Sequence, residues 1–359
     1  MCKAVITLPM MPVDGNNYGK YVTPIICEAL KKVYGAKYYQ CVNLLDSFND
    51  RSVLLADYIK SLNENGIQYD ELWIDSHNKK ILLNNIKKLV DMGYISEKVA
   101  NIYKCDCGVV EIEKSKIKTC NPNNSKFKYV GNDIYCKNCD NLCKKSEQKI
   151  LIFTPKNIKK QDIIFLPRYL NKDAKVYEEI LLNSNLNISR NRNTGIQLEY
   201  NNSIYNIDID FFWGTYLANF LEDEKIIVGG NKMSYQLFLV GMLEKIFNPG
   251  SKTILLGTPY IENLRGILYN KNFIEENVFR KLTILFSMGY SKKNVKVDDS
   301  TMKYLKKLSK YDLELLYNIV CNQDEIKGNF VDSTEDVLKY QFNLQKSVQK
   351  MKVWRDKNV

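Results

Sequence analysis

The chain has 359 residues, enough for a large core with two or three substructures, and 52 Lys and Arg against 41 Asp and Glu give a formal net charge of +11. The apolar runs are far too short to span a bilayer, and the brief apolar stretch at the amino terminus leads into Pro and Asp, so we expect a cytoplasmic protein with no membrane contact. The positive charge favours polyanionic partners such as RNA, unless lysine merely solvates the surface.

The first elements along the chain alternate between strand and helix. Residues 3–8 are an apolar, β-branched run that ends before Pro, which is typical of a buried parallel strand. Residues 23–35 repeat apolar side chains at helical spacing, and residues 37–45 have the pattern of a second strand. This order of strand, helix and strand predicts the start of a doubly wound α/β domain.

The pattern changes three times further along the chain. Residues 51–104 are amphipathic with helical spacing, and Gly93 is placed to end the second helix there. Strand-like runs return after a Cys-rich stretch, and a Lys-rich helical pattern then continues to the end. The expected segments are 1–104 as the first half of a Rossmann-like domain with a helical connection, 105–148 as a zinc-knuckle insertion, 149–270 as the second half of that domain, and 271–359 as a C-terminal helical region.

Six of the ten cysteines lie between positions 105 and 143. The strings CDCG and YCKNC each present two thiolates from a tight turn, and two such turns make a tetrahedral sulfur site suited to structural zinc. A reducing compartment disfavours disulfides, so structural free thiols are the main alternative. Because a short insertion buries little core, a metal would supply its folding energy. The predicted ligands are Cys105, Cys107, Cys136 and Cys139, with Cys120 and Cys143 left over.

Several strings now follow one another in a single order within residues 1–275: GIQYDELWIDSHNKKILLNNIKKLVDMGYI, the cysteine insertion, ISRNRNTGI, DIDFFWGTYL, VGGNKMSYQLFLVGML and KTILLGTPYIENLRG. This order resembles the class I aminoacyl-tRNA synthetases and is most similar to their methionyl-tRNA synthetase branch. Asn191 stands where that family has Asp, while Asp210 and Gly214 keep the spacing of a family tract. The resemblance implies a Rossmann catalytic domain that binds ATP and an amino acid, forms an aminoacyl adenylate and transfers the acyl group to tRNA.

The first signature of that family is a HIGH tetrapeptide after strand one, and the corresponding loop here is MPVDGNNYGKYV. Matching Gly19 places Asn17 and Lys20 at the histidine positions, while the single histidine of the chain is His77. Lys20 can hold a phosphate as a point charge at a helix N-terminus, and Asn17 can donate one hydrogen bond. The alternative is a simple turn followed by a solvated lysine.

The family's middle loop, near the ATP ribose, corresponds to VGGNKMSYQLFL, where Gly229 and Gly230 precede Asn231 in the place of Asp. Paired glycines let the backbone approach a ligand closely, and Asn keeps one acceptor without the charge. A plain strand-to-helix turn is the alternative. The last signature, KMSKS, falls at ILYNKN, where only Lys271 would reach a phosphate. The string KMS at 232–234 imitates that signature but comes one loop too early.

Three carboxylates are candidate contacts for the amino acid. Asp46 follows the second strand and could pair with a substrate ammonium, or it could favour a helix N-terminus. Asp208 and Asp210 alternate in NIDID, so on a strand they would share one face and offer two carboxylates to a cationic ligand. A solvated edge strand is the alternative for this pair.

Three functions remain open at this point. The first is a divergent ligase that uses ATP to activate an amino acid for tRNA or another acceptor. The second is a paralogue that has lost adenylation and binds tRNA or a protein partner as a regulator. The third is an aminoacyl-tRNA-using transferase on the same fold, which needs no ATP. The altered signature residues weigh against a housekeeping synthetase.

Overall fold

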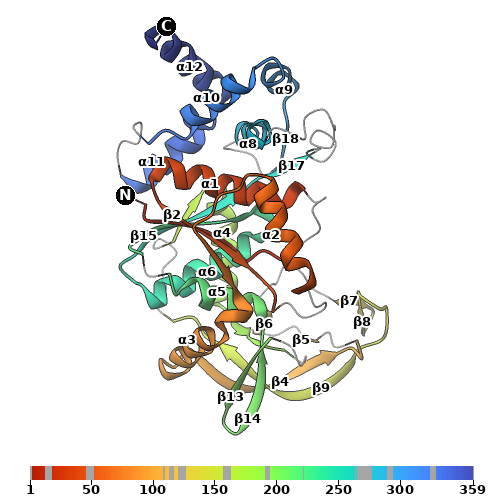
Figure 1. The fold of residues 1–359 in the computed structure, drawn as a ribbon. Coiled ribbons are helices and arrows are strands. Elements are labelled where there is room, and N and C mark those ends of the chain that lie inside the picture. The colour runs from red at the N-terminus through yellow and green to blue at the C-terminus, as the bar shows by residue number, and fades with distance from the viewer. Residues whose placement is uncertain are drawn as a thin grey trace.

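The computed structural model describes residues 2–12, 18–45, 52–107, 110–112, 117–119, 127–156, 163–190, 195–220, 222–262, 264, 277–288, 294–323 and 329–358. Its centre is a parallel sheet of six strands in the order β10-β16-β15-β1-β2-β3 (Figure 1). The strands are β1 Ala4–Thr7, β2 Lys37–Val42, β3 Glu71–Ile74, β10 Ile164–Leu166, β15 Glu224–Gly230 and β16 Lys252–Thr258. The predicted Rossmann-like α/β fold is therefore confirmed.

Helices cover both faces of this sheet, which explains why the middle residues of β1, β15 and β16 are apolar. Val5 and Ile226 pack into a core with α1 (Val22–Tyr34), and their chain neighbours Ile6 and Ile227 pack into a second core on the opposite face. Gly35 ends α1 in the left-handed conformation with φ 62°, as a helix C-cap requires. The second core is built on α3 Lys79–Asp91, α4 Leu170–Leu182, α5 Ile209–Leu217 and α6 Ser234–Phe247.

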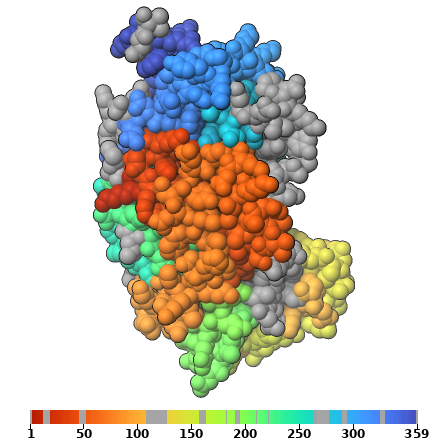
Figure 2. All heavy atoms as spheres, in the orientation of Figure 1, coloured from red at the N-terminus to blue at the C-terminus, as the bar shows by residue number. Residues whose placement is uncertain are grey.

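The cysteine-rich region belongs to a second, five-stranded sheet in the order β5-β4-β9-β11-β6. Its long central pair joins β4 (Ile95–Lys104) to β9 (Lys144–Phe153) in antiparallel register. Figure 2 shows this region, with β4 in orange and β9 in yellow, projecting from the side of the α/β body. The other strands here are β5 Val110–Ile112, β6 Ile117–Thr119 and β11 Asn185–Asn187, with a separate hairpin of β7 Phe127–Val130 and β8 Asp133–Cys136.

The expected helical connection over residues 51–104 is only partly correct. The helix α2 (Leu55–Glu64) and α3 are present, but β3 and β4 are strands. The reason is that β3 pairs with β2 and β4 pairs with β9, so distant partners set the conformation of both segments. β9 begins at Lys144, inside the predicted insertion 105–148, and pairs with β4 just before it. The boundaries of that insertion therefore stay a proposal.

The strand that was expected to carry Asp208 and Asp210 ends before them. β13 (Ile196–Tyr200) and β14 (Ser203–Ile207) form a hairpin, and α5 begins at Ile209. The backbone oxygen of Asp208 accepts from the amide of Phe212, 3.0 Å away, as the first turn of that helix forms. The prediction of a shared strand face is therefore wrong, because the buried aromatic residues of α5 favour helix directly after β14.

The C-terminal region is helical, as expected, and lies above the sheet in Figure 1. The short parallel pair of β17 (Tyr260–Glu262) and β18 (Asn294–Lys296) lies beside it. No helix among the described residues is long and apolar enough to cross a membrane. The helices are α8 Asn277–Phe286, α9 Asp299–Leu305, α10 Lys310–Val320, α11 Phe330–Asp336 and α12 Leu344–Asn358.

Candidate functional site

A cavity of about 380 Å³ opens at the carboxyl edge of the central sheet, beside β1 and β15. The chain leaves β1 toward β2 on one side, whereas β15 is followed by β16 on the other side. This reversal of strand order is the point at which doubly wound sheets bind ligands. The residues that line the cavity are Leu8, Pro9, Met10, Met11, Gly19, Lys20, Val22, Thr23, Trp213, Val228, Gly229, Gly230, Asn231, Lys232, Met233, Thr258, Pro259, Tyr260, Ile261 and Leu264.

The first wall is the chain that follows β1. The amide of Leu8 donates to the carbonyl of Val228 at 2.8 Å, and the amide of Met10 donates to Cys41 at 3.0 Å. These bonds hold the segment extended between β15 and β2 and bring Met10 and Met11 to the cavity. The 3-10 helix η1 (Tyr18–Tyr21), which leads into α1, supplies Lys20.

The second wall is the turn between β15 and α6. A Cβ atom at Gly229 would overlap Leu8 Cδ1, so glycine allows the two strand ends to pack closely. The 3-10 helix η5 (Asn231–Met233) follows directly and continues into α6 at Ser234. The string IIVGGNKMSYQ is therefore a strand-to-helix turn next to the cavity.

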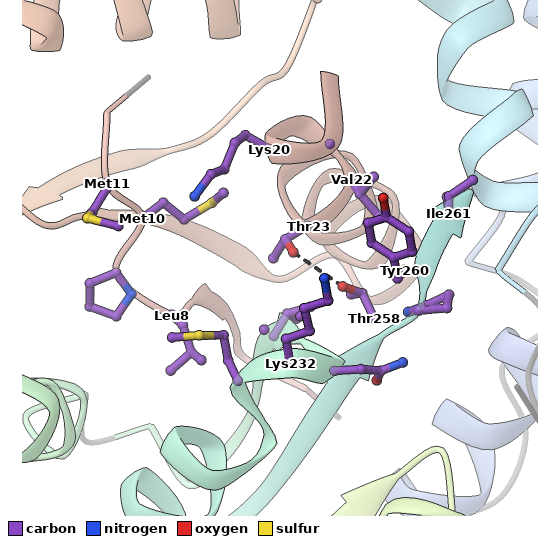
Figure 3. A pocket seen from close by; sticks show the side chains of 18 of the residues that line it. Leu8, Met10, Met11, Lys20, Val22, Thr23, Lys232, Thr258, Tyr260 and Ile261 are labelled. Carbon is purple, nitrogen blue, oxygen red and sulfur yellow. Dashed lines mark hydrogen bonds between the residues drawn. The ribbon is translucent and has the colours of Figure 1, made fainter. Parts of the chain in front are cut away.

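The third wall lies at the end of β16. Thr23 Oγ1 in α1 is 3.4 Å from Thr258 Oγ1, so a hydroxyl pair joins the start of α1 to β16. Lys232 Nζ lies 4.6 Å from the centroid of the Tyr260 ring, a cation–π contact. Figure 3 shows Lys20 and Lys232 reaching into the cavity from different walls.

The described lining is largely apolar, and its only charged side chains are Lys20 and Lys232. Its polar groups also include the two threonine hydroxyls and the Asn231 amide. The single histidine of the chain, His77, lies in the 3-10 helix η3 (Asp75–Asn78), outside this lining. Such a cavity suits a ligand that combines an apolar group with an anionic group.

A second candidate site is formed by four thiols of the cysteine insertion. The sulfur atoms of Cys105, Cys107, Cys136 and Cys139 all lie within 4.8 Å of one another. Two of these separations are 3.3 Å, from Cys105 to Cys139, and 3.6 Å, from Cys107 to Cys136. Tetrahedral zinc with Zn–S bonds of about 2.3 Å requires sulfur separations of roughly 3.8 Å. The four residues therefore fit a zinc ion.

The turn at Cys136 has the hydrogen bonds of a metal-binding knuckle. The amide of Asn138 donates to Cys136 Sγ at 3.4 Å, and the amide of Asp140 donates to the Cys136 carbonyl at 2.9 Å. Asp140 adopts φ 57°, which turns the chain back toward β9. Amide donors of this kind orient and stabilise a thiolate ligand. Cys143 is buried nearby but lies outside the group of four, and Cys120 is outside the described residues.

Solved structures with a similar fold include methionyl-tRNA synthetases of Mycobacterium tuberculosis. The complex with methionyl-adenylate has a TM-score of 0.62 at 10% identity, over 89% of this chain and 71% of the other. A second methionyl-adenylate complex gives 0.60 at 10% identity over the same shares. The free-state structure gives 0.64 at 9% identity, over 98% and 80%.

This chain has a class I synthetase-like fold. No protein-family model and no curated protein sequence matches it. The likeness to the methionyl branch is therefore one of structure, and the sequence resemblance predicted the fold correctly.

Five of the residues singled out from the sequence surround the cavity beside β1 and β15. Asp208 does not line it, and Asp210 lies in α5 with its side chain outside the described residues. The candidates Asn17, Asp46 and Lys271 lie outside the described residues, as does Asn191. The five that the fold brings together are Gly19, Lys20, Gly229, Gly230 and Asn231.

The structure also brings residues to the cavity that the sequence patterns did not single out. Thr258 and Tyr260 come from the end of β16 and the start of β17, and Trp213 comes from α5. Lys232 was interpreted only as part of a misplaced signature. Their position in the sequence could have indicated them, because polar and aromatic residues directly after parallel strands lie at the ligand-binding edge of the sheet.

Proposed function

We propose that the protein is a divergent class I synthetase-like ligase that binds ATP and an amino acid and forms an aminoacyl adenylate for transfer to tRNA or another acceptor. The observation that carries the proposal is the apolar cavity at the carboxyl edge of β1 and β15, with Lys20 and Lys232 facing it. A structure of similar fold was determined with methionyl-adenylate bound, a ligand that combines an apolar side chain with a phosphate. In the proposed site, Gly19, Gly229, Gly230 and Asn231 contact the nucleotide.

The ligand groups have separate places in this proposal. Lys20 and the backbone near Gly19 face the phosphates, because a cation and helix amides stabilise charge that develops on phosphorus. Met10, Met11 and Trp213 offer an apolar surface to the amino-acid side chain. Asp46, Asn17 and Lys271, which lie outside the described residues, stay proposed contacts. A structural zinc ion on the four cysteines completes the proposed cofactor set.

A second candidate is a non-adenylating paralogue that binds tRNA or a protein partner as a regulator. The observation in its favour is that the described cavity lining contains no histidine, since His77 lies in η3. A net charge of +11 is compatible with tRNA binding in either case. A transferase that uses preformed aminoacyl-tRNA is the third candidate, and it would need the cavity for an aminoacyl-adenosine end without free ATP.

Pyrophosphate exchange into ATP separates these candidates. We expect exchange that depends on one amino acid or a small set, tested with the standard and several modified amino acids. A matched variant is Lys20→Gln, which should lower exchange by roughly tenfold or more if Lys20 stabilises the transferred phosphate. Flat exchange with every amino acid, together with salt-sensitive tRNA binding in a gel shift, would instead support the regulator. Flat exchange together with transfer from aminoacyl-tRNA to an acceptor would support the transferase.

A further inference from the structure

Lys232 has a fixed place at the carboxyl edge of the sheet. It lies in η5, between the end of β15 and the start of α6. Gly229 and Gly230 on β15 pair in register with Gly257 and Thr258 on β16, so the strand is hydrogen-bonded up to the residue before η5. The amide of Ser234 then donates back to Asn231 and closes the turn. The backbone of Lys232 is therefore held by regular structure, and its long side chain extends from the turn to the ring of Tyr260.

The ammonium of Lys232 rests over an aromatic ring and has no carboxylate partner within the described part of the chain. Its Nζ lies 4.6 Å from the centroid of Tyr260, and Tyr260 is 51% exposed. A cation–π contact at such an exposed position is weak compared with a charge-assisted hydrogen bond. An incoming anion would therefore displace the ring from the ammonium at little cost.

The cavity next to Lys232 is suited to an anionic ligand. Lys20 reaches in from η1 on the opposite wall, so two positive charges from separate elements face one largely apolar space (Figure 3). No negative charge lies among the described lining residues. Two ammonium groups beside a largely apolar cavity attract an anion more strongly than the same charges would in bulk water, because an apolar lining screens charge less than water does.

We propose that Lys232 is an anion-binding residue of this cavity. When the nucleotide binds, the Lys232 ammonium moves off the Tyr260 ring and binds a phosphate group. The inference deepens the proposed function and rests on it, because that function supplies the nucleotide. The sequence patterns predicted phosphate contacts only for Lys20 and Lys271. This inference adds a phosphate contact from the turn after β15. Affinity should then rise with phosphate charge, from adenosine to AMP to ATP.

The test compares the affinities of adenosine, AMP, ATP and inorganic tripolyphosphate for the wild type and Lys232→Gln by calorimetric titration. We expect Lys232→Gln to weaken ATP by roughly tenfold or more, the loss of one charged hydrogen bond, and to leave adenosine within about twofold. Lys232→Arg should retain most of the ATP affinity. The matched control is Lys303→Gln, an exposed lysine on α9 away from the cavity, which should change nothing. An unchanged melting temperature of the free Lys232→Gln variant shows that it folds.

The outcomes separate this inference from the proposed function. Wild-type and Lys232→Gln proteins that prefer ATP over adenosine to the same extent would overturn the role of Lys232 while leaving nucleotide binding in place. If the wild type binds neither ATP nor adenosine, nucleotide binding fails. The tripolyphosphate titration then decides. If the wild type binds tripolyphosphate and Lys232→Gln does not, the anion site at Lys232 is supported. If neither protein binds tripolyphosphate, the anion site is overturned as well.

Discussion

The ammonium of Lys281 in α8 lies 2.6 Å from the carboxylate of Glu28 in α1, and both side chains are buried. The same ammonium donates to the carbonyl of Gly66, also at 2.6 Å, so one cation joins α8 to α1 and to the turn after α2. The C-terminal region is thereby attached to the helix whose first residues, Val22 and Thr23, line the cavity.

Removing the carboxylate of this pair should destabilise the protein. In Glu28→Gln the buried Lys281 loses its counter-charge, and we expect unfolding to become easier by about 3 kcal/mol. The matched control is Glu71→Gln, which breaks the exposed pair of Glu71 with Lys37 and should cost less than about 1 kcal/mol. Urea unfolding measures both. If both variants lose the same free energy of unfolding, burial of the Glu28–Lys281 pair does not increase its contribution to stability.

Asp75 should make stability depend on pH in the mildly acid range. Its carboxylate accepts from the amides of Leu44 at 2.8 Å and Leu45 at 3.3 Å, and it is fully buried. Burial raises the pKa of Asp75 from its ordinary 3.8 to about 6, against the lowering effect of these amides. Because the folded pKa is the higher one, the folded state binds the proton more tightly, and Asp75 stabilises the fold as pH falls from about 6 to about 4.

The variant Asp75→Asn removes this titration and keeps an oxygen acceptor. The wild type should gain stability relative to the variant by on the order of 3 kcal/mol between about pH 7 and pH 4. Urea unfolding of both proteins across this range measures the difference. A constant difference would mean that the folded and unfolded pKa values of Asp75 are the same.

The cysteine cluster should hold close to one zinc ion per chain. Cys136→Ser should lose the metal and expose the insertion to proteolysis, because structural zinc supplies the folding energy of such a small unit. Cys143→Ser is the control, since Cys143 lies beside the cluster but outside the group of four. Elemental analysis of the purified variants gives the answer. Zinc retained in Cys136→Ser but lost in Cys143→Ser would reassign the ligands.

Gly257 should not tolerate a side chain. A Cβ atom there would overlap Leu170 Cδ1 and lie 2.8 Å from Asn231 Oδ1, in the packed space behind the cavity. Gly257→Ala should cost about 1–3 kcal/mol by overpacking and should displace Asn231. Gly250→Ala is the control, because a Cβ at Gly250 meets nothing within 4 Å. Thermal unfolding compares the two, and equal melting temperatures would show that Leu170 moves aside freely.

Local patterns were enough to predict part of the fold and of the sites. The apolar runs at β1, β2, β15 and β16 mark parallel strands because both faces of such a sheet are covered. The tight turns at Cys105 and Cys136 predicted paired thiols, and the structure brings both pairs together. The sequence likewise placed Gly229, Gly230 and Asn231 at a strand-to-helix turn.

Where a partner lies far away in the sequence, local patterns failed. β4 was expected to be helical, but ten of its residues pair with β9, which begins forty positions after β4 ends in the chain. Asp208 was placed on a strand face because NIDID alternates, yet burial of the next aromatic residues in the second core favours a helix. The period of a short segment does not reveal which neighbours will cover it.

The sequence by itself determined the α/β class, the apolar runs of the central strands and the two turns that each carry two cysteines, because these follow from residues close together in the chain. Only the tertiary structure decided which side chains share the cavity. Lys20 and Lys232 are more than two hundred positions apart, and they line the same cavity because β1 and β15 are neighbours in a parallel sheet whose carboxyl ends lie at one edge. The same packing placed Tyr260 over Lys232 and buried Glu28 against Lys281.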